Sequence, residues 1–264
     1  MTTDTPSRQR FLEEYRQIRH AEGRGSDDPA YYRALPYRDI TGRNSAMWAM
    51  RAATYRYFEN RILSRIEART NRPLDILDLG AGNCWMSNRL ALRNHRPVAA
   101  DIFEDSRDGL RCAHHYSQPF VAVAAEFDQL PFPSTSFDLV VFNSSLHYST
   151  DYDVTLAESR RCLRPDGQLV ILDSPIYRRP EHGERMAAER HQQFQRQFGF
   201  RSDAIRSIEY LDEATLARLS QSLGISWTIH RPWYGWAWHL RPLKAFLGRR
   251  RPPSRFWILV GQFR

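Results

Sequence analysis

The sequence predicts an α/β protein with a mainly parallel central sheet and helices on both of its faces. From about residue 74 onward, short apolar runs alternate with stretches of helical spacing, as in strands joined by helical crossovers. The first of these runs ends in a glycine turn that opens into a helix, which leaves free backbone N–H groups for a ligand. The chain has 264 residues, 42% of them hydrophobic, which is enough to bury one large core.

Residues 1–70 are predicted to form an N-terminal helical cap. An amphipathic helix comes first, and a second helix with one apolar face spans residues 45–69. Between them, Tyr31, Tyr32 and Tyr37 lie in a segment that is rich in arginine and has no helical period. Because these three tyrosines do not form a core-facing stripe, we expect them to line a substrate site.

Residues 71–175 are predicted to form the ligand-binding core. The expected strands are residues 74–79, 97–100, 120–125, 137–142 and 168–172. Helices are expected from residue 84, over residues 104–115 and over residues 151–163. A turn at residues 164–167 contains Pro and Gly, which stop the last of these helices before the fifth strand.

Residues 176–264 are predicted to be a substrate-side insertion followed by the last strands. The polar segment up to Tyr210 interrupts the rhythm, with a helix near residues 185–198. Asp212 is the expected N-cap of a helix that ends at Gly224. Strands at residues 225–230 and 256–262 complete the sheet. There is no internal repeat, so residues 1–264 are expected to form a single domain.

The composition limits the class of protein and its setting. Three cysteines lack the Cys-x-x-Cys spacing, so we expect neither a disulfide framework nor a metal site, and a cytoplasmic setting fits. Residues 1–10 form no apolar signal region, and no apolar run approaches the ~20 residues that a membrane span needs.

The net charge is +8, and Lys244 is the only lysine. Arginine binds carboxylate and phosphate groups well, so the charge favours an anionic partner, with lineage bias as the alternative explanation.

A second feature narrows the ligand that the glycine turn can hold. Asp101 ends the second strand about twenty residues after the turn, where nucleotide-binding folds place the carboxylate that accepts from ribose hydroxyls. The third glycine of a dinucleotide fingerprint would fall at Trp85, which is too bulky for close helix–strand packing. NAD and FAD are therefore disfavoured.

Five segments resemble motifs of the class I S-adenosylmethionine (SAM)-dependent methyltransferases. DLGAG at residues 78–82 resembles the first motif, and Asp101 matches the ribose-binding acid. AEFDQLPF at residues 125–132, FDLVVFN at residues 137–143 and LRPDGQL at residues 163–169 resemble later motifs in the family order. The similar subgroup includes ubiquinone and menaquinone C-methyltransferases and natural-product small-molecule methyltransferases.

This resemblance implies a Rossmann-like seven-stranded methyltransferase sheet and SAM as cofactor. The residues implied to contact SAM are Asp78, Gly80, Ala81, Gly82, Asp101, Ile102, Glu126, Phe127 and Asn143. The glycines would approach the methionine part, Asp78 its amino group, and Ile102 and Phe127 the adenine. Many relatives have Asp immediately before the adenine-packing residue, and this chain has Glu126 there. The replacement keeps a carboxylate, but its side chain is longer.

The expected reaction is methyl transfer to a small-molecule acceptor on oxygen, carbon or nitrogen. Alignment of acceptor and methyl group is the main requirement. His147, which has a reference pKa of about 6.5, is the candidate general base, with Tyr148 beside it. The alternative is that His147 only shapes the pocket. Trp233 joins the three tyrosines as a candidate for an apolar or aromatic substrate wall.

The sequence also bears on other classes of function. The sequence lacks the Asn-Pro-Pro segment of base-amine methyltransferases, and nucleic acid is not favoured. Trp and Tyr interleaved with arginine over residues 231–255 fit contact with an anionic membrane surface and a lipid or quinone-like substrate. The alternative is that these tryptophans fill a core. An RNA-binding methyltransferase and a non-catalytic SAM binder are weaker alternatives, and the oligomeric state is not determined by the sequence.

Overall fold

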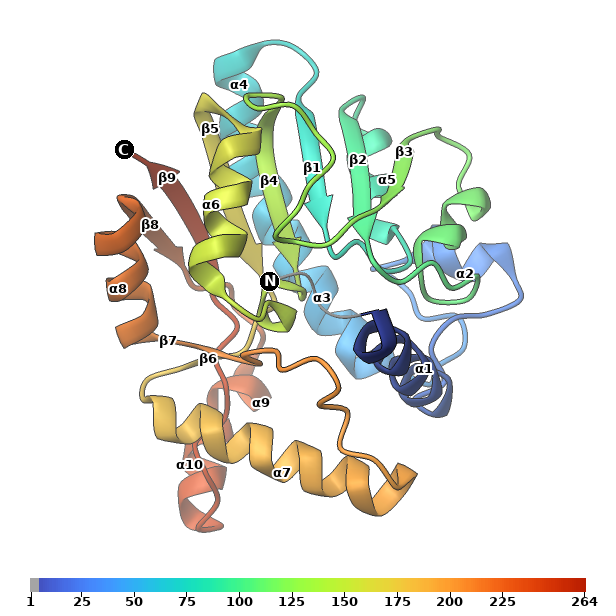
Figure 1. The fold of residues 1–264 in the computed structure, drawn as a ribbon, viewed down its shortest axis with the longest axis vertical. Helices are drawn as coiled ribbons and strands as arrows, with labels where there is room; N and C mark the ends of the chain where they lie inside the picture. The colour runs from blue at the N-terminus through green and yellow to red at the C-terminus, as the bar shows by residue number, and fades with distance from the viewer. Residues whose placement is uncertain (1–4) are drawn as a thin grey trace.

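The computed structural model describes residues 5–264. A seven-stranded sheet lies at the centre, in the order β3-β2-β1-β4-β5-β9-β8, with helices on both faces (Figure 1). The first five strands in this order run parallel, whereas β9 is antiparallel to both β5 and β8. The predicted fold class is confirmed.

The strands closely follow the apolar runs of the sequence. They are β1 (Asp75–Leu79), β2 (Arg96–Asp101), β3 (Val121–Ala124), β4 (Phe137–Asn143), β5 (Leu163–Leu172), β8 (Ile225–His230) and β9 (Ile258–Phe263). β6 (Ile176–Tyr177) and β7 (Leu211–Asp212) form a separate two-stranded sheet. The turn expected at residues 164–167 lies within the range of β5.

Most helices also fall where the spacing predicts them. The α-helices are α1 (Thr5–Ala21), α2 (Pro29–Ala34), α3 (Ser45–Phe58), α4 (Ser64–Thr70), α5 (Trp85–Ala91), α6 (Tyr152–Cys162), α7 (Pro180–Phe198), α8 (Glu213–Leu223), α9 (Trp236–His239) and α10 (Arg241–Leu247). A π-helical turn, η1 (Glu59–Leu63), joins α3 to α4, so the predicted helix over residues 45–69 is confirmed. Asp212 caps α8 by accepting from the backbone N–H of Thr215 at 2.8 Å.

The helix predicted over residues 104–115 is wrong. Within this range only residues Leu110–His115 are helical, and they form the 3₁₀ helix η2. A second 3₁₀ helix, η3 (Leu146–Tyr148), follows β4. The Asp105 carboxylate accepts from the backbone N–H groups of Arg107 and Asp108 at 2.8 and 3.1 Å. Such a turn competes with a helix for the same donors. The short helices α2, α9 and α10 were not predicted, and α2 contains Tyr31 and Tyr32, which the sequence placed in a loop.

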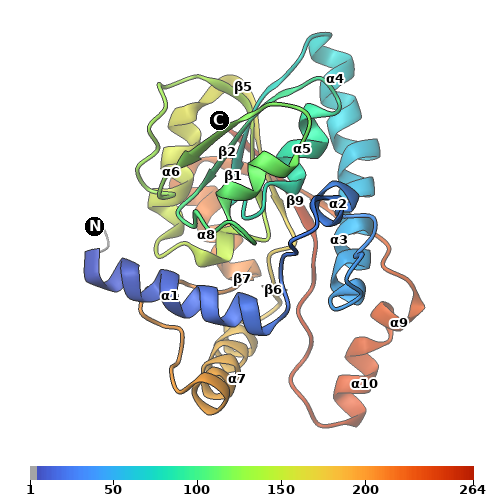
Figure 2. The ribbon, with the colours of Figure 1, turned by 90° about the vertical axis from the view of Figure 1, so that its right-hand side faces the viewer.

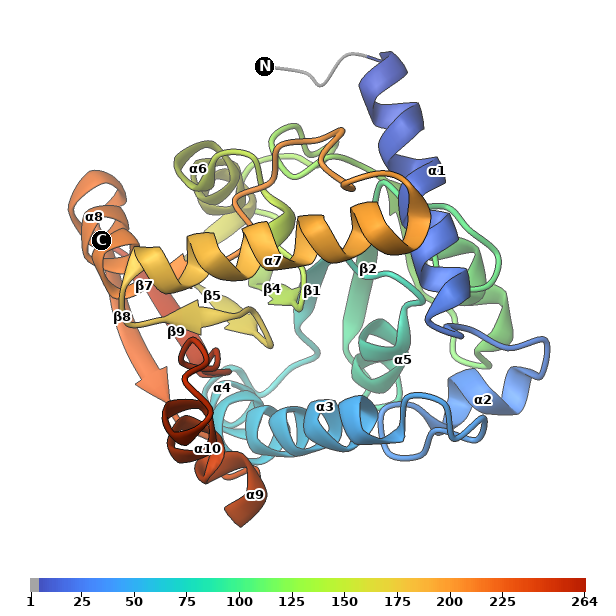
Figure 3. The same ribbon diagram turned by 90° about the horizontal axis from the view of Figure 1, so that it is seen from below.

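The sheet lies between α3 and α4 on one side and α6 and α8 on the other (Figure 2). Apolar side chains fill the space on both of its faces. One face packs large aromatic residues, including Trp48, Tyr55 and Trp85. The other packs Leu156, Leu216 and their neighbours against the strands. α1 and α7 cover neither face. They lie across the carboxyl end of the parallel strands, as seen from below in Figure 3.

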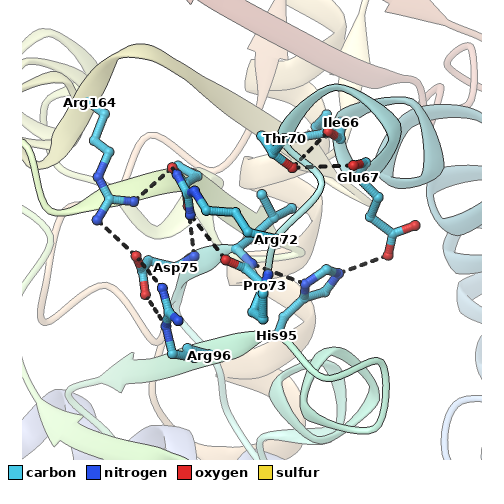
Figure 4. Close-up of polar contacts among 11 residues, drawn as sticks. Ile66, Glu67, Thr70, Arg72, Pro73, Asp75, His95, Arg96 and Arg164 are labelled. Atoms are coloured by element: carbon cyan, nitrogen blue, oxygen red, sulfur yellow. Dashed lines mark hydrogen bonds and ion pairs between the residues drawn. The ribbon is translucent and has the colours of Figure 1, made fainter.

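An ionic network closes the opposite, amino end of the sheet. Asp138 accepts two hydrogen bonds from the Arg72 guanidinium, at 2.8 and 2.6 Å, and one from the backbone N–H of Asp75. Arg96 and Arg164 bind the Asp75 carboxylate (Figure 4). Burial alone would raise the pKa of Asp138, but the hydrogen bonds from Arg72 and its neighbours outweigh burial and lower it to about 2.

We expect Asp138→Asn to lower the free energy of unfolding by about 2 kcal/mol at pH 7, because it weakens charge-assisted hydrogen bonds to a buried group. The pKa of Asp138 is depressed, so its contribution is present above the unfolded pKa of 3.8 and is lost as the pH falls through about 2. Urea unfolding should therefore show a gap between variant and parent that narrows below pH 4. The matched control is Asp166→Asn at an exposed position of β5. An equal loss in the control would contradict the role of the network.

Candidate functional site

A pocket opens at the carboxyl ends of β1, β2 and β4, next to α1. It encloses about 1190 Å³ of space between protein atoms, open solvent included. Its walls come from α1, α3, the turn after β1, the loops after β2, β3 and β4, and Ile205. Of the residues that the sequence implied for SAM, the pocket is lined by Gly80, Ala81, Gly82, Asp101, Ile102, Glu126, Phe127 and Asn143.

The glycine turn after β1 lets two loops approach each other closely. Gly80 has a φ of +73° and Gly82 a φ of +53°, which side chains other than glycine rarely adopt. A Cβ on Gly80 would lie 2.3 Å from the Cβ of Ser145. Only glycine therefore permits the loop after β4 to close against the turn and complete the pocket wall.

Asp101 is held in place by backbone groups. Its two carboxylate oxygens accept from the N–H groups of Gly82 and Phe103, each at 2.8 Å. Burial raises the pKa of Asp101, and these two hydrogen bonds oppose that rise. Each oxygen keeps a free lone pair at the pocket wall, so the fixed carboxylate can accept further hydrogen bonds from a ligand's hydroxyl groups.

Of the two other acidic residues expected to contact SAM, Glu126 lines the pocket and Asp78 does not. Glu126 lines the pocket and forms an ion pair with Arg8 at 3.2 Å. Asp78 is buried and is not among the lining residues; its carboxylate accepts from the Ser87 hydroxyl at 2.7 Å. Burial raises the pKa of Asp78 to about 7. Asp78 therefore lies beside the wall, and a contact with the cofactor's amino group stays a prediction.

The four predicted substrate residues do not line the pocket. Tyr31 and Tyr32 are buried in the core, and the Tyr32 hydroxyl lies within hydrogen-bond distance of the backbone oxygens of Ser26 and Arg107, at 2.8 and 2.7 Å. Tyr37 is 39% and Trp233 56% exposed. Tyr31 and Tyr32 belong to the packing of α2 against η2. The Tyr32 ring stacks on the His115 ring, with centroids 4.2 Å apart.

The two predicted catalytic residues separate in the structure. Tyr148 lines the pocket, but His147 does not. The His147 ring is buried, with Nδ1 3.4 Å from the Ser174 hydroxyl. Burial, and then the positive charges of Arg190 and Arg51, lower the pKa of His147 to about 3. The ring is therefore neutral at physiological pH, with a proton on only one of its two nitrogens.

Sequence reasoning missed the pocket residues that come from helices. Phe11, Tyr15 and Arg19 of α1 line it, and the Tyr15 ring meets Tyr148 edge-on at 5.9 Å. An ion pair between Arg19 and Asp108 fastens α1 beside the pocket. The apolar face of α1 could be recognised in the sequence, but nothing in it showed which surface that face would contact.

Arg51 of α3 brings an uncompensated positive charge to the pocket. Its guanidinium donates from Nη2 to the Ser144 hydroxyl at 3.0 Å, and its Nε is buried without a hydrogen-bond partner. Within residues 5–264, no carboxylate lies within ion-pair distance of Arg51. An unpartnered buried donor is costly, so this group is suited to bind an anionic part of a ligand.

Comparison with known proteins agrees with this geometry. The family model described as "Methyltransferase domain" matches residues 77–171. Over this segment the chain is similar to a methyltransferase domain. The segment spans the glycine turn, Asp101, the Glu126 loop and β4, so the resemblance inferred from the motifs is confirmed.

Three curated relatives match parts of the chain. A malonyl-[acyl-carrier protein] O-methyltransferase of Hahella chejuensis is 33% identical over 39% of this chain and 37% of its own length. The ubiquinone/menaquinone biosynthesis C-methyltransferase UbiE of the same organism is 42% identical over 37% and 42%. The human mitochondrial arginine-hydroxylase NDUFAF5 is 32% identical over 56% and 44%. The chain thus spans less than half the length of each of these relatives.

A solved structure shows the same fold over most of the chain. The PH0226 protein of Pyrococcus horikoshii superposes with a TM-score of 0.54 at 18% identity, covering 89% of this chain and 99% of that protein. At such identity the likeness concerns the fold alone.

We expect Asp78→Asn to stabilise the ligand-free protein more at pH 8 than at pH 5. The folded-state pKa of Asp78 is raised from 3.8 to about 7, so the stability of its neutral form is fully present below 3.8 and is lost as the pH rises through about 7. Asparagine imitates the neutral form and does not lose this contribution. Thermal unfolding should show the difference in Tm growing with pH. A difference in Tm that is independent of pH would count against a buried neutral Asp78.

Proposed function

We propose that the protein is a SAM-dependent methyltransferase that acts on a small-molecule acceptor. The observation that carries the proposal is the gathering of the glycine turn, Asp101, Glu126 and Phe127 around one pocket. These four features come from three separate loops at the carboxyl ends of parallel strands, where α/β sheets bind ligands. The methyltransferase family model covers the same segment.

The pocket residues fit the parts of SAM. The Asp101 carboxylate, fixed by two backbone N–H groups, would accept from the ribose hydroxyls. Ile102 and Phe127 offer apolar surface to the adenine, and the free Nε of Arg51 would donate to the methionine carboxylate. When bound, SAM supplies a methyl group on a positively charged sulfur, which reacts readily with a nucleophile.

The chain's own contribution to the reaction is alignment. Phe11, Tyr15, Tyr148 and Ile205 line the pocket and offer an aromatic and apolar wall to an acceptor. Holding acceptor and methyl group in line can supply much of the rate enhancement without a residue that gains or loses a proton. The names of two relatives, a malonyl-[acyl-carrier protein] O-methyltransferase and a quinone C-methyltransferase, support oxygen or carbon as acceptor atom.

We assign His147 a positioning role. Its backbone oxygen accepts from the N–H of Glu209 at 2.7 Å, which ties the loop after β4 to the segment that follows α7. Its ring contacts the Tyr148 ring, with centroids 4.5 Å apart. A base role for His147 stays a prediction that this geometry does not favour.

A second candidate is a membrane-surface methyltransferase with a lipid or quinone-like acceptor, favoured by exposed aromatic residues such as Trp236 near the carboxyl end of the sheet. An RNA-binding enzyme fits the net charge alone. No helix within residues 5–264 is long and apolar enough to cross a membrane. Cys84, Cys112 and Cys162 are free and buried, which supports the proposed cytoplasmic setting.

Calorimetry with SAM tests the proposal directly. We expect measurable binding to the unmodified chain and a Kd about tenfold to hundredfold higher for Asp101→Asn, since a carboxylate that accepts from ligand hydroxyls makes strong hydrogen bonds. Glu104→Gln, at an exposed acid in the same loop, is the matched control and should bind as the parent does. Absence of binding to the parent would overturn the proposal.

The acceptor class is tested by the release of S-adenosylhomocysteine from SAM. We expect release when the small-molecule fraction of a cell extract is added. Release only with the macromolecular fraction would contradict a small-molecule acceptor.

The role of His147 can be measured without an acceptor. We expect the ring signals of His147, identified by their loss in His147→Ala, to show no titration between pH 5 and 8 in NMR spectra, because the pKa lies near 3. A midpoint near pH 6.5 for His147 would restore the base role.

A further inference from the structure

The outer side of α9 and α10 exposes an unusual number of large apolar side chains. These are Trp233 (56% exposed), Trp236 (76%), Leu240 (46%), Leu243 (54%), Phe246 (78%) and Leu247 (72%), and we call them the C-terminal patch. In α10 and its N-cap, positions 240, 243 and 247 repeat at the spacing of one helical face. Contiguous exposed apolar surface of this kind marks an interaction site in proteins that otherwise bury such groups.

The same segment is fastened to the body of the protein through its inner side. The Tyr234 hydroxyl donates to the backbone oxygen of Phe256 at 2.8 Å. Trp238 packs on Phe256 with ring centroids 5.5 Å apart, and Arg241 donates to the backbone oxygen of Ser254 at 2.7 Å. The segment therefore has two distinct sides, and the exposure of the C-terminal patch belongs to its folded arrangement.

The sequence left two roles open for the C-terminal tryptophans, which were filling a core or contacting a membrane surface. The structure shows which tryptophans fit the first role. Trp227 and Trp257 pack against the core, as a structural role requires. Trp233 contacts Trp236 and His239, and both tryptophans leave most of their surface exposed. Filling a core explains the first pair and does not explain the second.

Positive charge surrounds the C-terminal patch. Residues 231–264 contain no Asp or Glu. Arg251 and Arg255 pair with Glu189 and Glu213 of other segments. Lys244, Arg249 and Arg250 are exposed, and none forms an ion pair within the described residues 5–264. Exposed apolar groups and free cations thus share one surface.

We propose that the C-terminal patch docks the protein on the surface of an anionic lipid bilayer. Trp, Phe and Leu side chains insert at the boundary between headgroups and acyl chains, while cations beside them attract anionic headgroups. A second copy of the same patch would meet like charge and is disfavoured. RNA would use the cations but not the aliphatic Leu240, Leu243 and Leu247.

The position of the C-terminal patch fits this occupant. α9 and α10 lie beyond the carboxyl end of the sheet, the end that α1 and α7 also cover (Figures 1 and 3). The pocket opens at that same end, so docking would turn the pocket side of the molecule toward the membrane. The inference concerns binding alone and stands whether or not the protein transfers a methyl group.

Vesicle co-sedimentation without SAM tests the proposal. We expect the protein to sediment with phosphatidylcholine vesicles that contain phosphatidylserine, less with phosphatidylcholine alone, and less as NaCl increases. Lys244→Gln and Arg250→Gln should each weaken partitioning about fivefold. Trp236→Ser with Phe246→Ser should weaken it further, and both positions are exposed, so the fold should tolerate the changes.

The matched control is Arg61→Gln with Arg69→Gln, two exposed arginines on the η1–α4 segment at the other end of the sheet. This control should bind vesicles nearly as the parent does. Several results would overturn the proposal: no sedimentation with anionic vesicles, equal loss in the control, or full binding by the Trp236→Ser/Phe246→Ser variant. Binding to RNA in place of vesicles, or a dimer that hides these side chains from water, would overturn it as well.

Discussion

The close approach between the turn after β1 and the loop after β4 is the constraint on which the candidate site depends. Gly80 allows the two backbones to meet, since a Cβ there would lie 2.3 Å from Ser145. The same turn directs the N–H of Gly82 to the Asp101 carboxylate at 2.8 Å. One short segment thereby fixes the end of β1, the acid that ends β2 and the wall that follows β4. A residue with a side chain at Gly80 would disturb all three.

Charge is distributed so that each end of the sheet has a different role. At the amino end, Asp75 and Asp138 are neutralised by three arginines, and the network joins neighbouring strands. At the carboxyl end, Arg19 is neutralised by Asp108, but Arg51 keeps an unpartnered Nε. Satisfied ion pairs hold the fold together, whereas unsatisfied donors are available to a ligand. The arginine richness of the sequence therefore serves more than one purpose.

Predictions from the sequence succeeded where a short-range pattern sets the structure. Apolar runs bounded by turn residues gave every strand of the main sheet, and Asp212 and Gly224 bounded α8 as their types require. The prediction failed at residues 104–115, where the Asp105 carboxylate takes backbone donors that a helix would use. It also failed for Tyr31 and Tyr32, because aromatic composition is the same in a buried core as in a ligand site.

The sequence by itself determined the sheet, the glycine turn and the acid at the end of β2, because strand periodicity, positive φ angles and strand-end positions are local properties. Only the tertiary structure decided which helices reach the pocket. Arg51 lies far from Ser144 in sequence, and the packing of α3 on the sheet brings the two within 3.0 Å. Tertiary packing also left Trp233 and Trp236 outside while Trp257 joined the core. Burial depends on contacts between distant segments, which no local pattern encodes.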